Sequence, residues 1–333
     1  MFVIETYTTA VVFSLITMLC WGSWANTQKL ASSSWRFELF YWDYVLGIVL
    51  LSLIFGLTLG SMGTEGRSFI PDLVQGNQES LLSAFWGGII FNAANILLVA
   101  AIAISGMAVA FPVGIGLALV IGVIVNYLEN PIGNITLLFV GVALVALAIL
   151  LNATAYRSLN QSQSSQPTKG LILSLAAGIL MGFFYKYVAD SMFLDFTHPI
   201  PGKLSPYSAV FVFSLGIFFS NFFFNSFLMK RPFQGVPLKF SAYFQGSFLT
   251  HLTGILGGSI WCMGMSFSII AADKAGPAIS YGLGQGATMV AAFWGVFVWK
   301  EFKDLPPSKN SLLYLMFACF LIGLGLIIYS KLA

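Results

Sequence analysis

Ten apolar stretches follow one another along this chain of 333 residues. About 20 apolar residues suffice to span the hydrocarbon core of a bilayer. Lipid offers no partner to backbone N–H and C=O groups, so each stretch must satisfy its own hydrogen bonds as a helix. Only 8% of the residues are charged, against about 25% in soluble domains. The predicted spans are residues 7–28, 40–60, 81–104, 107–128, 135–156, 170–190, 206–229, 246–271, 276–299 and 311–330.

The two halves of the chain share an ordered series of small residues. Residues 87–116 slide onto residues 257–286 with matches that extend beyond both ranges. A repeat with an odd number of helices inserts its two copies in opposite orientations, which is a signature of transporters. The alternative is a chance match of glycines in apolar sequence. The matched pairs are Gly87 and Gly257, Gly88 and Gly258, Gly106 and Gly276, Ala108 and Ala278, Gly114 and Gly284, and Gly116 and Gly286. Both copies then run to an acidic residue at the helix end, Glu129 and Glu301, with a shift of two positions, and to a last helix that contains a glycine, Gly141 or Gly323.

A polar linker, residues 158–168, separates a first five-helix repeat, residues 1–157, from a second, residues 169–333. We therefore expect an all-α integral membrane protein with ten transmembrane helices in a 5+5 inverted repeat.

Lysine and arginine set the orientation, because cytoplasmic loops carry an excess of them. The richer face is predicted to be cytoplasmic, which leaves both termini on the non-cytoplasmic side of the cell inner (plasma) membrane. The richer face holds Lys29, Arg36, Arg157, Lys169, Lys230, Arg231, Lys239, Lys300, Lys303 and Lys309, and the other holds Arg67, Lys203, Lys274 and Lys331.

Motifs of soluble enzymes are absent from the sequence, including HExxH, GxSxG and the P-loop. Two histidines and three cysteines make a metal site or a bound cofactor an unfavoured interpretation. No basic cluster indicates nucleic acid. We expect a transporter rather than an enzyme. Its expected partners are a small polar solute, the lipid bilayer and protons, and a homo-oligomer stays open.

Buried amides are the first candidates for solute binding. Gln285 lies among glycines near the middle of an apolar stretch, where an unpaired amide is costly. Asn92 and Asn95 share a helix face through their i, i+3 spacing. Amides donate and accept hydrogen bonds, as a neutral polar solute requires. The alternative for all three is helix packing and interhelical hydrogen bonding.

Aromatic residues are the second set of candidates. Trp21 and Trp24 are also spaced i, i+3, and their rings could stack on a sugar or a planar heterocycle while the indole N–H donates. Trp261 is a weaker candidate of the same type. Tyr185 and Tyr281 could donate to a solute. Anchoring at the membrane interface is the alternative for the tryptophans.

Three ionisable residues within the spans are candidates for proton coupling. His251 titrates nearest to neutral pH, and a structural hydrogen bond is its alternative. Asp43 is expected to pair with Arg36 or Lys29 if it is structural. Lys186 precedes Asp190 by four residues, so its alternative is an i, i+4 ion pair.

Three short motifs give the chain a family resemblance. They are Trp21-Gly-Ser-Trp24, Val125-Asn-Tyr-Leu-Glu129 and Ala291-Ala-Phe-Trp-Gly-Val296 followed by Glu301. They resemble the drug/metabolite transporter (DMT) superfamily, and within it the ureide permease family and bacterial sugar porters of the glucose/ribose and rhamnose–proton symporter type. The resemblance implies a central cavity lined by helices 1, 3, 4, 6, 8 and 9, and alternating access. Plant ureide permeases carry a long central loop, whereas residues 157–169 are short here.

We therefore predict a secondary transporter that imports a small neutral polar solute, either a sugar or a ureide or nucleobase, by alternating access. Transport is driven by protons or, alternatively, by the solute gradient. The alternative on the same fold is an exporter of amphipathic drugs or metabolites. That alternative rests on the aromatic content and on Met107, Met181, Met263, Met265 and Met289.

Overall fold

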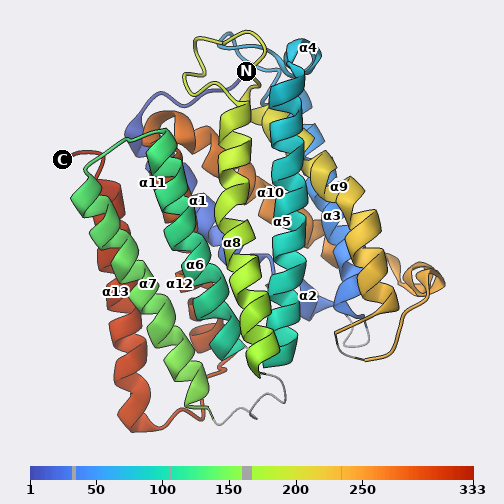
Figure 1. Cartoon of the computed structure of the whole chain (residues 1–333), viewed down its shortest axis with the longest axis vertical. Helices are drawn as coiled ribbons and strands as arrows, with labels where there is room; N and C mark the ends of the chain where they lie inside the picture. Colours follow the sequence, from blue (N-terminus) through green and yellow to red (C-terminus); the bar gives the residue numbers. More distant parts are fainter. Residues whose placement is uncertain (32–34, 106, 160–166, 234) are drawn as a thin grey trace.

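The structure is a computed structural model that describes residues 1–31, 35–105, 107–159, 167–233 and 235–333. Figure 1 shows a bundle of long helices, with both termini toward the end that carries α4 and with α2 toward the opposite end. Residues 160–166 of the expected linker and Gly106 of the repeat lie outside the described residues. The elements are α1 (Tyr7–Ser23), α2 (Asn26–Leu30), α3 (Phe37–Leu57), α4 (Phe69–Gln75), α5 (Gln78–Ser105), α6 (Met107–Glu129), α7 (Ile135–Arg157), α8 (Pro167–Ser191), α9 (Pro206–Lys230), η1 (Phe240–Gln245), α10 (Phe248–Ala275), α11 (Pro277–Gly284), α12 (Ala287–Phe293), η2 (Trp294–Val298), η3 (Pro307–Lys309) and α13 (Asn310–Tyr329).

The expected helical class is confirmed. Seven helices of the described chain are long and apolar enough to cross a membrane: α3, α5, α7, α8, α9, α10 and α13. α1 has 17 residues and continues, after a turn at Trp24 and Ala25, into the short helix α2. The expectation that residues 276–299 form one continuous helix is wrong.

The break in that stretch lies at Gln285 and Gly286, between α11 and α12. The backbone N–H groups of Gly286, Thr288 and Met289 each bond the carbonyl three residues earlier, at 2.9–3.2 Å. These tighter bonds replace the α-helical ladder for one turn. A π-helical turn, η2, then follows α12 and rotates its side chains relative to an α-helical continuation. Glycines and a polar amide in the sequence permit such a break, but only packing against α1 and α10 fixes it.

The helices pack in a pattern that repeats between the two halves. α1 packs on α10, as α8 packs on α5. α3 packs on α10, as α9 packs on α5. The pairs α3–α9 and α7–α13 each join helices that the expected repeat would make equivalent, and α7 and α13 lie side by side at one edge of Figure 1.

Glycines mark the closest crossings, and they occur in matched pairs. A Cβ added at Gly258 of α10 would lie 1.8 Å from the carbonyl oxygen of Tyr44 on α3. A Cβ added at Gly88 of α5 would lie 2.0 Å from the carbonyl oxygen of Phe213 on α9. Gly88 and Gly258 are the residues that the sequence repeat aligned. The helices therefore meet backbone to backbone, as small residues allow.

The reciprocal contacts follow the same rule. A Cβ at Gly47 of α3 would lie 2.1 Å from the carbonyl oxygen of Ile255, and one at Gly216 of α9 would lie 2.1 Å from that of Phe85. Phe85 precedes Gly88 by three residues, as Ile255 precedes Gly258. The two crossings thus have the same register.

Candidate functional site

A cavity of about 770 Å³ enters the bundle from the end that carries α2. At its mouth lie the exposed side chains of Lys29 and Trp299, and at its deep end lie the buried side chains of Trp261 and Gln285. The lining comes from both halves of the chain. The lining residues include Trp21, Trp24, Lys29, Trp35, Phe91, Asn95, Asn152, Tyr156, Met181, Phe184, Trp261, Gln285, Ala291, Trp299 and Glu301.

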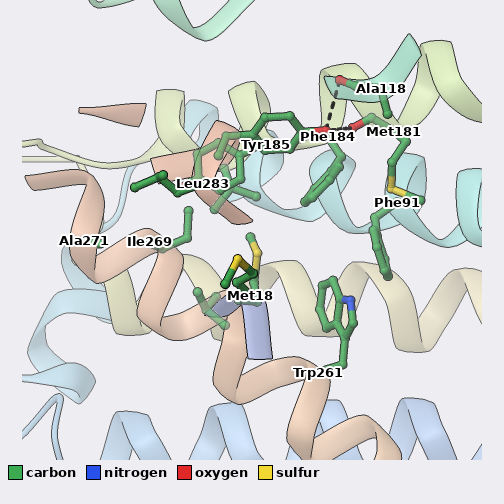
Figure 2. Close-up of a cluster of buried hydrophobic side chains, with 14 of the residues drawn as sticks. Met18, Phe91, Ala118, Met181, Phe184, Tyr185, Trp261, Ile269, Ala271 and Leu283 are labelled. Carbon is green, nitrogen blue, oxygen red and sulfur yellow. Dashed lines mark hydrogen bonds between the residues drawn. The ribbon is translucent and has the colours of Figure 1, made fainter. Parts of the chain in front are cut away.

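Aromatic rings form the deep end. Phe91 and Trp261 lie with ring centroids 4.3 Å apart, and Trp21 stacks on Trp261 at 5.9 Å. Figure 2 shows Phe91, Trp261 and Phe184 grouped with Met181. Such flat faces offer stacking surfaces to a planar ligand. Sequence reasoning chose Trp21 and Trp261 but missed Phe91 and Phe184, because phenylalanine in an apolar helix carries no signal that separates a cavity wall from a core.

Methionine contributes little to this wall. Of the methionines that supported the exporter alternative, Met181 lines the cavity and Met265 is fully buried in helix packing. The side chain of Met107 lies outside the described part of the chain.

The Gln285 amide is held at the helix break, with α11 on one side and α12 on the other. The side chain is 8% exposed and lines the cavity. It forms no side-chain hydrogen bond with any described residue, and neither of its polar atoms is sealed from the cavity. A buried amide without a protein partner needs water or a ligand to satisfy it. Gln285 therefore offers one donor group and one acceptor to a bound solute.

Two further amides face the same cavity. Asn95 of α5 is 6% exposed and uses its Nδ2 to donate to the Tyr41 hydroxyl at 3.1 Å. Asn152 of α7 is also 6% exposed and lines the cavity, while its Oδ1 is buried and has no hydrogen-bond partner among the described residues. Sequence reasoning missed Asn152. Its signal was an amide inside an otherwise apolar helix, on a helix that the family resemblance placed outside the cavity lining.

Trp24 lines the cavity nearer its mouth. Its ring lies against Tyr44 at 4.7 Å. Both predicted tryptophans of the first helix therefore line one cavity, Trp21 at the deep end and Trp24 above it.

Asn92, Tyr185 and Tyr281 do not line the cavity. Asn92 is fully buried between α3, α5 and α9. The hydroxyl of Tyr185 lies 3.1 Å from both the carbonyl oxygen and the Oγ of Ser268. Both tyrosine rings are fully buried beyond the deep end.

Tyr281 ties three helices together at that closed end. Its hydroxyl lies 3.2 Å from the carbonyl oxygen of Ala118 and 3.1 Å from that of Met181. Dashed lines in Figure 2 end on these two carbonyls. With Tyr185 packed against it at 5.2 Å, Tyr281 fills the packed core between α6, α8 and α11.

A cluster of polar and aromatic side chains surrounds the mouth. Glu301 accepts from the Tyr156 hydroxyl at 2.6 Å and from Lys29 at 3.0 Å. Lys29 also lies over the Trp299 ring, 4.5 Å from its centroid. Lys300 has φ +53°, in the left-handed region that side chains other than glycine rarely adopt. That conformation turns the chain after η2 and brings Glu301 back to the mouth.

The Glu301 carboxylate is stabilised in its ionised form. Burial by itself raises the pKa of Glu301, but the hydrogen bonds from Tyr156 and Lys29 and the charge of Lys29 outweigh burial and lower it. The carboxylate and the ammonium are the two formally charged side chains among the described lining residues, and they pair with each other. The cavity wall is thus electrically balanced, which suits a neutral solute better than an ion.

Asp43 pairs with His251, so the expectation that its partner is Arg36 or Lys29 is wrong. His251 Nδ1 lies 2.9 Å and 3.0 Å from the two Asp43 carboxylate oxygens. Tyr243 of η1 also donates to Asp43, at 2.5 Å. Arg36 instead pairs with Glu38, and Lys29 with Glu301. The packing of α3 on α10 brings the two side chains together, and this contact could not be predicted from their distant positions in the sequence.

The Asp43–His251 pair lies behind the cavity wall. Asp43 has 1% of its side chain exposed and His251 has 21%. Neither lines the cavity, but Trp35 does, and the Trp35 ring meets the His251 ring edge to face at 5.3 Å.

Lys186 lies at the end of the bundle opposite the mouth. It pairs with Asp190 at 2.6 Å, as the i, i+4 alternative predicted, and with Glu129 of α6 at 2.8 Å. Within the described residues, no group of three His, Cys, Asp or Glu residues is placed to hold a metal ion.

The comparisons with known proteins agree on one family. The sequence profile named Ureide permease matches residues 40–169 and 155–330. Ureide permease 1 of Arabidopsis thaliana is 24% identical over 392 aligned positions, which cover 99% of each chain. Ureide permease 2 of the same plant is 23% identical over 400 positions with the same coverage. Probable ureide permease A3 of Vigna unguiculata is 25% identical over 166 positions, 48% of this chain and 44% of that one.

A solved crystal structure shares the fold. It superimposes with a TM-score of 0.60 at 12% sequence identity, and the match covers 95% of this chain and 96% of the other. At that identity the likeness concerns the fold alone.

Proposed function

Because the chain belongs to the ureide permease family, it is a membrane transporter rather than an enzyme, and we propose that it imports a small neutral polar solute. A ureide or a nucleobase is the proposed class, and a sugar is the second. The observation that carries this proposal is the cavity, where aromatic faces and three incompletely paired amides surround a space with balanced charge.

The chemistry of the wall supports a planar heterocycle with both donors and acceptors. The rings of Trp21, Trp261 and Phe91 offer flat apolar faces. Gln285 and Asn95 offer hydrogen bonds at the edges of a bound ring. Ureides and nucleobases combine a flat ring with alternating N–H and C=O groups, so one ligand can use both features.

The proposed membrane architecture has ten spans in a 5+5 inverted repeat of the DMT type. α1 with α2, α6, and the run from α11 through η2 add three spans to the seven long helices. The matched glycine crossings at Gly88 and Gly258 support the repeat. In this arrangement the α2 end faces the cytoplasm, and both termini lie outside the plasma membrane.

Alternating access is supported by two ion pairs at opposite ends of the bundle. Lys29, after the first helix of one half, pairs with Glu301, after the fourth helix of the other half. Lys186, on the first helix of the second half, pairs with Glu129, on the fourth helix of the first half. Each pair thus joins equivalent helices across the repeat. Because the Lys29–Glu301 pair is formed while the cavity is open at the α2 end, we propose that the Lys186–Glu129 pair, at the closed end, is the one that favours closure of its own face.

Breaking the Lys186–Glu129 pair is expected to shift the transporter toward opening at the face opposite α2. With Ala291→Cys as a reporter in the cavity wall, Glu129→Gln should lower labelling by an impermeant maleimide from the α2 side, whereas Glu301→Gln should leave labelling near the value of the reporter protein. Exposed ion pairs contribute about 0.2–1 kcal/mol, so we expect a change of up to about fivefold. Labelling rates in oriented vesicles measure this. Unchanged labelling in Glu129→Gln, or an equal fall in both variants, would contradict a gate at the Lys186–Glu129 pair.

Uptake into liposomes tests the proposed function. Purified protein with an inward proton gradient should accumulate radiolabelled allantoin, uracil or a hexose. Gln285→Met keeps the side-chain length and removes both hydrogen-bonding atoms. Loss of one or two bonds to a neutral ligand should raise KM about tenfold or more.

Asn221→Leu is the matched control for Gln285→Met. Asn221 is fully buried and, like Gln285, has no side-chain partner among the described residues, but it lies on α9 away from the cavity. Its KM should stay near the wild-type value. Export of lipophilic cations with no uptake of any polar solute would overturn the importer in favour of the exporter.

A further inference from the structure

A chain of hydrogen bonds links the wall of the cavity to the packed core between α3, α5 and α9. Asn92 Nδ2 donates to Ser220 Oγ at 2.8 Å and to the Ile217 carbonyl at 3.3 Å. The Tyr41 hydroxyl donates to Asn92 Oδ1 at 2.9 Å. Asn95 Nδ2 donates to the Tyr41 hydroxyl oxygen at 3.1 Å. Asn92 and Tyr41 are fully buried, so Asn95 is the member of this series of hydrogen bonds that lines the cavity.

The donor and acceptor roles in this series of hydrogen bonds are fixed at its buried end. A backbone carbonyl only accepts hydrogen bonds, so the Asn92 group that faces Ile217 must be the NH₂ group. The Ser220 hydroxyl donates to the same carbonyl at 3.1 Å, so its oxygen accepts from Asn92. Asn92 must then turn its Oδ1 toward Tyr41.

These roles in turn fix the donor and acceptor at Tyr41 and at Asn95, which lines the cavity. With its single hydrogen donated to Asn92, the Tyr41 hydroxyl can only accept from Asn95. The Asn95 NH₂ group therefore faces Tyr41, and its Oδ1 remains without a partner among the described residues. One backbone carbonyl on α9 thus decides which atom of Asn95 faces a bound solute.

We propose that Asn92 is a positioning residue that acts through Tyr41 to hold the Asn95 carbonyl oxygen toward the cavity, so that the site selects solutes with an N–H donor. Asn92 itself touches no solute. This inference deepens the proposed function and rests on it for the identity of the solute, but the orientation of Asn95 is a property of the protein alone.

A matched pair of ring probes tests the selectivity. Hydantoin is a ureide ring with two N–H groups, and 1,3-dimethylhydantoin is the same ring with none. We expect the wild-type protein to prefer hydantoin by at least about tenfold in competition against uptake, because an unpaired buried acceptor penalises the analogue. Asn92→Leu frees the Tyr41 hydroxyl to donate to Asn95, and Tyr41→Phe removes the connection. Both should reduce the preference by about tenfold, whereas Asn221→Leu should leave it unchanged.

A readout without solute tests the orientation. In protein labelled with ¹⁵N-asparagine, the Asn95 side-chain NH₂ signal, assigned by its loss in Asn95→Asp, should exchange slowly with water. In Asn92→Leu it should exchange several-fold faster, because the NH₂ group then turns to the cavity. Equal exchange in the two proteins, or an unchanged hydantoin preference in both Asn92→Leu and Tyr41→Phe, would overturn the proposal. Failure of the wild-type protein to bind hydantoin, with the exchange difference intact, would instead count against the proposed solute class and its N–H selection.

Discussion

Gly258→Ala is expected to abolish stable folding of this protein. The added Cβ would lie 1.8 Å from the Tyr44 carbonyl oxygen and 2.7 Å from its carbon. Both obstacles are backbone atoms, which no change of rotamer can move aside. α3 and α10 would have to separate, and overpacking of this kind costs about 3 kcal/mol or more. We expect monodisperse protein to be lost, or its melting temperature in detergent to fall by about 6–12 °C, at roughly 2–4 °C per kcal/mol.

The chain offers a matched control in Gly116 of α6, where an added Cβ meets nothing within 4 Å. Gly116→Ala should leave melting unchanged or raise it slightly, because alanine is favoured over glycine inside a helix by about 0.5–1 kcal/mol. Gly88→Ala should behave like Gly258→Ala, since it occupies the matched crossing. A Gly258→Ala protein that melts like Gly116→Ala would disprove the backbone contact between α3 and α10.

Asp43→Asn is expected to remove proton-driven accumulation while downhill solute exchange continues. Asparagine keeps the shape of the side chain and an acceptor for Tyr243, but it cannot take up a proton. One pH unit corresponds to about 1.4 kcal/mol, enough for about tenfold accumulation at one proton per solute. The accumulation ratio should therefore fall from about tenfold to about one. Solute uptake into liposomes with and without an imposed pH gradient measures both quantities.

Asp190→Asn is the control for that experiment, because Asp190 is a partly exposed carboxylate at the opposite end of the bundle, where Lys186 keeps Glu129 as a partner. It should retain proton-driven accumulation. If Asp43→Asn accumulates solute as the wild-type protein does, the Asp43–His251 pair is a structural link between α3 and α10. In that case protons either bind at another residue or do not drive solute transport.

The helix bundle could be predicted because its cause is local. A long apolar stretch must form a helix wherever it lies in a membrane, whatever packs beside it. The glycine pattern also indicated where pairs of helices pack closely. The sequence aligns Gly88 with Gly258, and both glycines lie at matching helix crossings. Gln285 could also be predicted to face the cavity from local sequence, because an amide among glycines in an apolar stretch is costly unless protein, water or a ligand satisfies it.

Tertiary structure decided which polar residues face solute and which face other helices. Asn92 and Asn95 look alike in the sequence, yet Asn92 bonds α9 and Asn95 faces the cavity. Asp43 and His251 lie more than 200 residues apart in the chain and form one pair. A side chain inside an apolar helix has about equal reason to bind a solute or a neighbouring helix, because both satisfy the same hydrogen-bonding groups. Only the position of the neighbouring backbones, set by the glycine crossings, separates the two outcomes.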